Sequence, residues 1–286
     1  GLPLVGEQKN PLKTTTYGVG QLMKHALEHG AKELILALGG SATNDGGCGC
    51  AAAMGTRFFN AGGKEFVPAG GTLSSIACID NSETKRLLDG VRVTAMCDID
   101  NPMHGPSGAA FVFAPQKGAD PETVRFLDGE LVALDTCLSR ELGADVASVP
   151  GAGAAGAMGA GVLAFFGAEL KPGIEAVLDA VHFEQRIRNA DYIVTGEGKI
   201  DGQSLRGKVV SGVSRRAKAL HVPVLAIVGD VGDDIGAVYE LGVTAVFSTN
   251  QQAIPFSEAK KRSEKDYRFT VQNLFRLLFE TENRKN

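Results

Sequence analysis

The sequence predicts an α/β protein in two parts, and three observations carry that prediction. In the C-terminal part, residues 222–228 (VPVLAIV) are apolar throughout, which is typical of a strand buried on both faces of a parallel sheet. Strand and helix patterns alternate there, as in βαβ units. The N-terminal part mixes strands, a hairpin and helices without that alternation. We therefore expect a mixed α+β domain over residues 1–185 and a parallel-sheet domain over residues 186–286.

The N-terminal part contains most of the expected elements. Residues 34–38 are an apolar strand, and residues 17–29 form a helix with Thr16 as its N-cap. Residues 57–66 resemble a hairpin that turns at the sequence NAGG. Two further strands are expected at residues 91–96 and 109–113. Two further helices are expected at residues 123–142 and 157–166.

The C-terminal part is predicted from its alternation. Strands are expected at residues 191–195, 222–228 and 245–248, and helices at residues 209–220 and 235–241. A final amphipathic helix covers residues 257–280. It is expected to turn four apolar side chains toward a core, those of Phe269, Leu274, Leu277 and Leu278.

Composition and charge exclude several classes of partner. The chain has 286 residues, enough for one large or two ordinary domains, with 44% apolar and 22% charged residues. Its net charge is -4, and the sequence contains no long basic run. Binding to nucleic acid or to an anionic membrane therefore has no electrostatic support, and neither partner is expected.

The cysteines and the absence of targeting signals indicate a cytoplasmic protein. No apolar run approaches the roughly 20 residues that a membrane span needs, and no signal peptide is visible. The chain does not begin with Met, so it could be the interior of a longer protein. Its cysteines form no CxxC pair and are expected to be reduced thiols: Cys48, Cys50, Cys78, Cys97 and Cys137.

The loop after the first strand is the most informative segment. It reads GGSATNDGG over residues 39–47, and its glycine pairs let the backbone turn tightly and approach a ligand closely. We interpret it as a site for a small polyhydroxy or phosphorylated ligand. The alternative is a glycine-rich connection between a strand and a helix. The candidate side chains offer hydroxyl, amide and carboxylate groups: Ser41, Thr43, Asn44 and Asp45.

A second polar cluster follows the expected strand at residues 91–96. Asp98 and Asp100 lie in the sequence CDIDNP, where they either contact a ligand or form Asx turns. Further along, Lys117 in the sequence APQKGA could neutralise an anion. His104 is the one histidine near these segments, and no Ser-His-Asp arrangement can be argued from it.

A GxGxxG string occurs at Gly151, Gly153 and Gly156. No strand precedes it directly, so it is a poor dinucleotide fingerprint. It is either a loop that leads into a helix N-terminus, where free N–H groups favour an anion, or a closely packed helix start.

Residues 202–209 nearly match a P-loop, but Val209 stands where a Mg²⁺-binding Ser or Thr is needed. A true P-loop is therefore not expected. Glu197 and Asp201 could hold Mg²⁺ directly or through water, and the alternative is a solvated charged loop. Three cations could meet phosphates, namely Lys199, Arg206 and Lys208.

Five segments together resemble the bacterial glycerate kinase family of the type associated with glycolate, glucarate and galactarate breakdown. They are LALGGSATNDGG, CDIDNP, GPSGAAFVFAPQKGA, PGAGAAGAMGAG and TGEGKIDGQSLRGK. The resemblance runs along essentially the whole chain. It implies two α/β domains with the active site between them: a discontinuous Rossmann-like domain whose N-terminal part lies upstream of Gly1, and a middle domain.

The resemblance implies ATP-dependent, Mg²⁺-requiring phosphorylation of D-glycerate to 2-phosphoglycerate. On that basis Asp45 is the expected base, and Ser41, Thr43, Asn44 and Asp98 are expected to bind substrate. The expected nucleotide contacts are Gly151, Gly153, Gly156 and Lys208, and the expected metal ligands are Glu197 and Asp201.

Three alternatives stay open at this point. They are a glycerate 3-kinase, a nicotinamide-dependent hydroxy-acid oxidoreductase, and a sugar-acid sensor without catalytic activity. The oxidoreductase would need an acidic residue about 20 positions after a strand-borne GxGxxG, which is not evident. The oligomeric state is also open, with a homodimer as one option.

Overall fold

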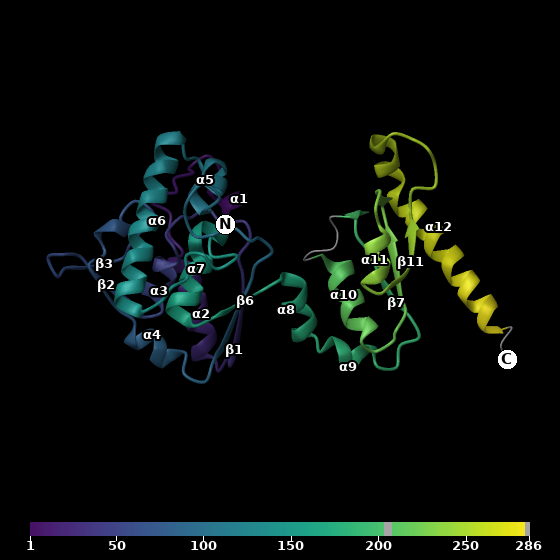
Figure 1. Ribbon diagram of the computed structural model, residues 1–286, viewed down its shortest axis with the longest axis horizontal. Coiled ribbons are helices and arrows are strands. Elements are labelled where there is room, and N and C mark those ends of the chain that lie inside the picture. The colour runs from purple at the N-terminus through teal and green to yellow at the C-terminus, as the bar shows by residue number, and fades with distance from the viewer. Residues whose placement is uncertain (203–207, 284–286) are drawn as a thin grey trace. The chain divides into compact units, whose positions relative to one another are not determined.

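A computed structural model describes residues 1–202 and 208–283, and its chain divides into two compact units, Gly1–Gly173 and Ile174–Asn286 (Figure 1). The fold is mixed α/β with parallel sheets, as the sequence predicts. The division falls earlier than the expected boundary at residue 185, because two helices that begin before that point pack with the C-terminal unit. These helices are α8 (Gly173–Ala180) and α9 (Phe183–Ile187).

The apolar faces of α8 and α9 explain the displaced boundary. Leu178 and Ile187 share a buried cluster with Val213 and Ala217 of helix α10 (Val209–Lys218). That contact depends on which helix faces meet in space. The sequence alternation that set the expected boundary therefore missed it.

The N-terminal unit is organised by a three-stranded parallel sheet. Its central strand is β5 (Arg92–Met96), which pairs with β1 (Glu33–Ala37) on one side and β6 (Glu169–Lys171) on the other. The predicted strands at residues 34–38 and 91–96 are thus confirmed. Both expected ligand loops begin where β1 and β5 end.

A small antiparallel sheet lies in the same unit and confirms the predicted hairpin. Strand β2 (Arg57–Phe59) pairs with β3 (Glu65–Phe66) and with β4 (Cys78–Asp80). The remaining short elements of this unit are α1 (Leu2–Val5), α2 (Tyr17–Glu28), α3 (Cys48–Ala53), η1 (Leu73–Ser75) and α4 (Ser82–Leu87).

The long helix α6 (Pro121–Leu142) runs along one side of the N-terminal unit (Figure 1). Asp120 is its N-cap and accepts a hydrogen bond from the Thr123 backbone N–H at 2.7 Å. Gly143 ends it in the left-handed conformation, with a φ of 65°. The helix therefore begins and ends at residues that satisfy its free backbone groups.

Residues 109–113 form helix α5 (Ala109–Phe113), so the predicted strand there is wrong. A short apolar run has no periodicity that separates strand from helix. In the folded unit Ala109 and Ala110 are fully buried, whereas Phe111 and Val112 are partly exposed. Helix α5 continues into the 3₁₀-helix η2 (Pro115–Lys117), and this succession brings Lys117 into the interior.

Helix α7 (Ala154–Phe166) opens with an unusual left-handed turn. Ala155, Gly156 and Ala157 have φ values of 55°, 71° and 66°. A Cβ on Gly156 would overlap the Thr43 carbonyl, and the Gly46 N–H donates to the Gly156 carbonyl at 3.1 Å. The start of α7 therefore packs directly onto the loop that follows β1.

The C-terminal unit contains a second parallel sheet. Strand β9 (Val224–Val228) is buried at every position and lies between β7 (Ile193–Thr195) and β11 (Val243–Ser248). This arrangement confirms the predicted alternation of strands with helices. The unit also contains a short pair, β8 (Lys199–Ile200) with β10 (Asp230–Val231), and helix α11 (Gly236–Glu240).

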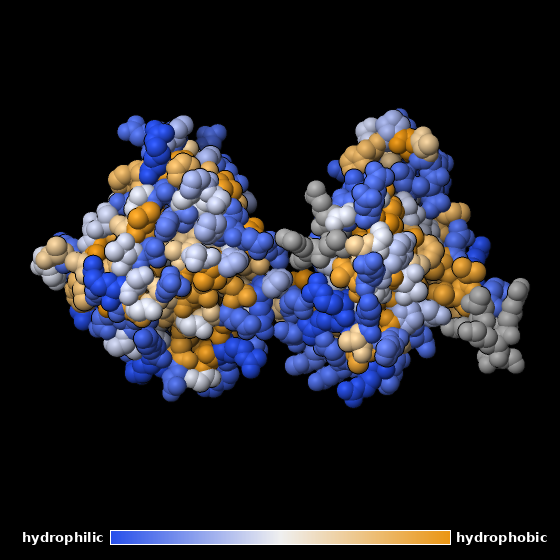
Figure 2. Space-filling model, viewed as in Figure 1, coloured by the Kyte–Doolittle hydropathy of each residue, from blue (hydrophilic) through white to orange (hydrophobic). Residues whose placement is uncertain are grey.

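The final helix α12 (Phe256–Asn283) confirms the predicted amphipathic segment only in part. Leu274 is buried against the sheet and Leu278 packs beside it. Phe269 and Leu277, which were expected to face a core, are 52% and 60% exposed. Figure 2 shows apolar surface along this helix.

All five cysteines are free thiols. Burial raises the pKa of the Cys48 and Cys50 thiols, so both behave as small apolar core residues and not as nucleophiles. Within residues 1–202 and 208–283, none of the helices has the length and apolar character needed to cross a membrane.

The packing of α7 predicts opposite effects for two Gly→Ala substitutions. Gly156→Ala is expected to lower the free energy of unfolding by about 2 to 4 kcal/mol, because it adds a left-handed alanine and a steric overlap. Gly129→Ala lies within α6, where a Cβ meets nothing within 4 Å, and it is expected to raise the same quantity by up to about 1 kcal/mol. Urea titration followed by circular dichroism measures both. Equal effects would contradict the packing described here.

Candidate active site

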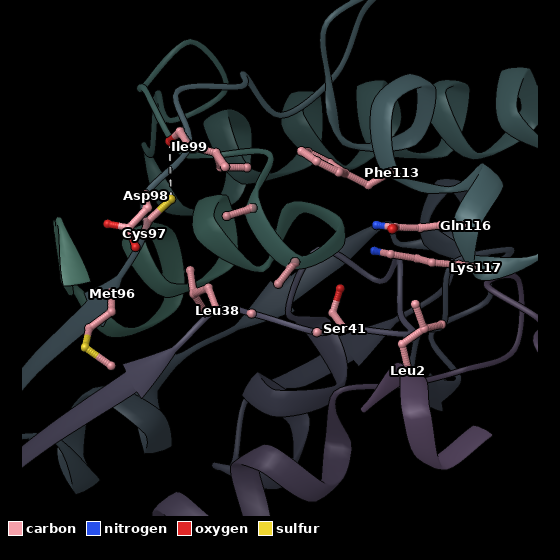
Figure 3. A pocket seen from close by; sticks show the side chains of 14 residues that line it. Leu2, Leu38, Ser41, Met96, Cys97, Asp98, Ile99, Phe113, Gln116 and Lys117 are labelled. Carbon is pink, nitrogen blue, oxygen red and sulfur yellow. Dashed lines mark hydrogen bonds between the residues drawn. The ribbon is translucent and has the colours of Figure 1, made fainter. Parts of the chain in front are cut away.

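A cavity of about 350 Å³ opens at the carboxyl ends of β1 and β5 (Figure 3). The carboxyl edge of a parallel sheet is where open α/β folds bind ligands. Four segments supply most of its wall, namely residues 38–41 after β1, residues 96–99 at the end of β5, residues 116–117 of η2, and residues 154–155 of α7.

Two of the predicted substrate residues meet in this cavity. Ser41 reaches it from the loop after β1, and Asp98 reaches it from the loop after β5. The Asp98 side chain is exposed, and its Oδ1 accepts a hydrogen bond from the Gly173 N–H at 2.8 Å. Thr43 lines an adjoining cavity of about 530 Å³, which also includes Ser41 and Ala155. Tertiary structure thus brings the loops together.

Asp45 lies beneath these cavities and lines neither of them. Its side chain has no exposed surface. Oδ2 accepts hydrogen bonds from the Thr16 N–H at 2.7 Å and from the Thr16 hydroxyl at 2.9 Å. The Gly47 and Gly49 N–H groups donate to the same carboxylate at 3.3 Å each. Burial raises the Asp45 pKa, and the hydrogen bonds from Thr16, Gly47 and Gly49 oppose that rise.

These contacts favour a positioning role for Asp45. The carboxylate joins the start of α2 to the start of α3 and so holds the loop between β1 and α3 in place. The predicted N-cap Thr16 also connects the two helix starts. Its hydroxyl donates a hydrogen bond to Asp45 and accepts one from the Cys50 N–H at 2.8 Å. It makes no side-chain cap bond to α2. The assignment of Asp45 as a base stays a prediction.

The loop after β1 contains buried polar atoms without hydrogen-bond partners among the described residues. Asn44 is fully buried, yet its amide oxygen and nitrogen have no hydrogen-bond partner in the described part of the chain. The Thr43 hydroxyl is also buried and also has no hydrogen-bond partner among the described residues. Leaving such groups unsatisfied costs about 1 to 3 kcal/mol each. A bound ligand or ordered water is the usual reason for retaining them.

Lys117, which the sequence marks only as a cation that could neutralise an anion, lines the same cavity as Asp98. Its side chain is only 1% exposed, and Nζ donates to the Thr43 carbonyl at 2.6 Å. Burial lowers the Lys117 pKa to about 8, against the attraction of the Asp45 charge. The sequence APQKGA signalled a possible anion contact, but helix α5 and η2 were needed to bring this lysine inside.

The glycines of the GxGxxG string are used for close packing. A Cβ on Gly151 would lie 2.8 Å from the Cys97 sulfur, and one on Gly153 would overlap the Pro102 carbonyl. Together with Gly156 they let α7 approach the two ligand loops. The geometry favours the closely packed helix start over an anion cradle, and the nucleotide role of these glycines stays a prediction.

The remaining predicted residues lie in the C-terminal unit. The Glu197 carboxylate accepts a hydrogen bond from the Val210 N–H at 3.2 Å, at the start of α10, where Lys208 is the N-cap residue. Asp201 follows β8. Arg206 lies outside the described residues.

Glu197 and Asp201 are chemically suited to Mg²⁺. No group of three or more His, Cys, Asp or Glu side chains converges as a metal site among the residues that the structure describes. Mg²⁺ bound with a nucleotide typically takes one or two carboxylates and completes its shell with phosphate oxygens and water. Two carboxylates after β7 and β8 fit that pattern.

A larger cavity, of about 740 Å³, lies within the C-terminal unit. Residues 229–230 after β9 and 249–250 after β11 line it, so it too is at the carboxyl edge of a parallel sheet. Helix α12 contributes Lys260, Ser263 and Asp266. Each unit thus has its own candidate ligand site.

Parallel sheets with cavities and polar loop residues at their carboxyl edges are typical of α/β proteins that bind small ligands. Comparison with known proteins makes this class specific. The model of the glycerate kinase family matches residues 1–279. The chain therefore belongs to the glycerate kinase family and is a kinase.

Individual relatives agree with that membership. Glycerate kinase from Bacillus cereus is 48% identical over 268 residues, which cover 94% of this chain and 70% of the relative. Glycerate 2-kinase from Escherichia coli K12 is 45% identical over 249 residues, covering 87% and 65%. A crystal structure of a protein assigned as glycerate kinase 2 from Salmonella typhimurium LT2 superposes with a TM-score of 0.84 at 40% identity, covering 99% of this chain and 74% of that one.

The buried carboxylate predicts a stability effect for Asp45→Asn. The substitution replaces an acceptor oxygen with a donor facing other donors, so the free energy of unfolding is expected to fall by about 2 to 4 kcal/mol. Asp120→Asn is the matched control, because Asn caps a helix about as well as Asp. Urea titration of both variants tests this. An unchanged free energy of unfolding in Asp45→Asn would mean that the loop does not depend on this carboxylate.

Lys117 predicts a pH effect on stability. Its folded pKa of about 8 lies below the unfolded value of about 10.4, so the unfolded chain binds more protons between these values. Stability is then expected to rise with pH across this window, by at most on the order of 3 kcal/mol. Lys117→Met should lack this rise, and Lys64→Met, at an exposed position, should retain it. Parallel pH curves for all three chains would contradict the burial of a charged lysine.

Proposed function

We propose that this chain phosphorylates D-glycerate with ATP and Mg²⁺ and releases 2-phosphoglycerate. The observation that carries the proposal is the cavity in which the loops after β1 and β5 meet, in a chain of the glycerate kinase family. The product assignment draws on the Escherichia coli relative, whose name is glycerate 2-kinase.

The acceptor is proposed to bind in the N-terminal unit. A cavity of about 350 Å³ suits a three-carbon hydroxy acid, and Ser41 and Asp98 line it. Thr43 and Asn44 supply buried polar atoms that have no hydrogen-bond partner among residues 1–202 and 208–283. These four residues form the proposed substrate set.

The nucleotide is proposed to bind with the help of the C-terminal unit. Its 740 Å³ cavity suits a larger ligand, and Lys208 at the start of α10 is a candidate phosphate contact. Glu197 and Asp201 are the proposed Mg²⁺ ligands. Bound Mg²⁺ would neutralise charge on the phosphate oxygens. A contribution from Gly151, Gly153 and Gly156 is retained as a weaker part of the proposal, because protein atoms occupy the space beside them.

Phosphoryl transfer requires alignment, charge neutralisation and an acceptor for the hydroxyl proton. A base must lie within hydrogen-bond reach of the hydroxyl. Asp98 is exposed and lines the acceptor cavity, whereas Asp45 is buried beneath it. We therefore assign proton acceptance to Asp98 in preference to Asp45, which orders the loop.

The alternative functions differ in how well they agree with the structure. The oxidoreductase requires a strand immediately before the GxGxxG string, and residues 148–153 are turns and bends instead. A glycerate 3-kinase differs only in its product, so identification of the phosphorylated product distinguishes it. The cytoplasmic location is part of the proposal and agrees with five free thiols.

A coupled assay for ADP release tests the function. With D-glycerate, ATP and Mg²⁺ the chain is expected to turn over, and product analysis should identify 2-phosphoglycerate. Asp98→Asn is expected to lower kcat by about 10²-fold or more, the contribution typical of a general base. Asp100→Asn, an exposed neighbour that does not line the cavity, should leave kcat nearly unchanged. Stabilisation by glycerate without turnover would favour the sensor and exclude the proposed kinase reaction.

A further inference from the structure

We propose that the Lys117 ammonium is the carboxylate-binding group of the acceptor cavity, where it and the Gln116 amide receive the carboxylate of a small hydroxy acid. This inference rests on the proposed function for the identity of the acid. It adds two binding residues and the orientation of the acid in the cavity, which neither the family match nor the relatives assign.

Lys117 has unused hydrogen-bonding capacity. A lysine ammonium carries three N–H donors. In the described part of the chain Nζ makes one hydrogen bond, to the Thr43 carbonyl at 2.6 Å, and forms no ion pair. The side chain is 1% exposed. A charge this deeply buried is costly unless an opposite charge meets it, so an anion is expected there.

The polar side chains of the cavity converge from one side. Figure 3 shows the Gln116 amide and the Lys117 ammonium pointing into the same cavity, with the Ser41 hydroxyl directed toward them. Asp98 lies across the cavity. A hydroxy acid with its carboxylate at Lys117 therefore turns its hydroxyl groups toward Asp98. The opposite orientation would place two carboxylates together.

The size and charge of the cavity also favour a carboxylate. Its volume of about 350 Å³ is smaller than that of the adjoining cavity, about 530 Å³, and of the cavity in the C-terminal unit, about 740 Å³. A single ammonium flanked by neutral donors matches one negative charge. A nucleoside triphosphate carries several. The carboxylate of the acceptor is therefore the better occupant than a nucleotide phosphate.

Few charged groups face Lys117. Asp45, in the loop after β1, is the carboxylate whose attraction acts on it. Asp98 and Cys97, after β5, line the same cavity, and burial raises the pKa of the Cys97 thiol so that it stays neutral. Lys9 lies beside the glycine that follows Lys117. Helices α1 and α7 contribute only apolar lining residues. Loss of the Lys117 proton is therefore the main expected change in cavity charge as pH rises above neutrality.

Isothermal titration calorimetry with D-glycerate tests the proposal on the whole chain. Lys117→Met is expected to raise the Kd by at least about tenfold, as for loss of a charge-assisted hydrogen bond. Lys64→Met is the control and should not change it. Glycerol, which lacks a carboxylate, should bind the parent and Lys117→Met equally weakly.

A pH titration of the unsubstituted chain gives an independent readout that survives if Lys117→Met fails to fold. Between about pH 7 and about pH 9.5, the Kd for D-glycerate is expected to rise about tenfold, because the ammonium is lost. Cys97→Ser should show the same rise. Lys117→Arg, which stays charged, should show a flatter profile.

The possible results separate this inference from the proposed function. An unchanged Kd in Lys117→Met, or a flat pH profile in the parent, would assign Lys117 to a structural contact with Thr43 and overturn the inference. A larger loss of ATP affinity than of glycerate affinity would assign the lysine to the nucleotide and overturn it as well. Lysine-dependent glycerate binding without ADP release would uphold the inference while the kinase proposal fails.

Discussion

The buried carboxylate of Asp45 is the interaction on which the N-terminal unit depends. It accepts hydrogen bonds from Thr16 at the start of α2 and from Gly47 and Gly49 at the start of α3. Both helix starts have free N–H groups and a positive dipole end, which together make a fully buried carboxylate tolerable. The loop between β1 and α3 is thereby held from below, while Ser41 and Thr43 remain available to the cavities above.

The same loop is held from the side by two less common features. The left-handed turn of α7 places Gly156 against the Thr43 carbonyl, and the Lys117 ammonium donates to that carbonyl from η2. Left-handed alanines and a buried ammonium each cost free energy. Conformations with such a cost persist where the surrounding structure holds them in place, and they are common at functional sites. The proposed acceptor cavity therefore includes segments that are unfavourable by themselves and are held by their neighbours.

Sequence patterns predict which loops converge on a cavity better than they predict which side chains are buried. Loops after β1 and β5 were predicted as ligand segments, and Ser41 and Asp98 do line one cavity. Asp45 stood out for its position among glycines, but burial cannot be inferred from a polar loop. The sequence marks Lys117 only as a cation that could neutralise an anion. Its burial depends on α5, and an apolar run of five residues does not distinguish that helix from a strand.

The sequence by itself determined the fold class, the strand ends that carry the polar loops, and the family. Local periodicity and contiguous motifs are sufficient to predict these features. Tertiary structure alone decided the boundary at Gly173, the burial of Asp45 and Lys117, and the use of Gly156 as a packing surface. The physical reason is that burial and charge compensation depend on which segments meet in space. Residues far apart in the chain, such as Thr43, Lys117 and Gly156, acquire their roles only from that meeting.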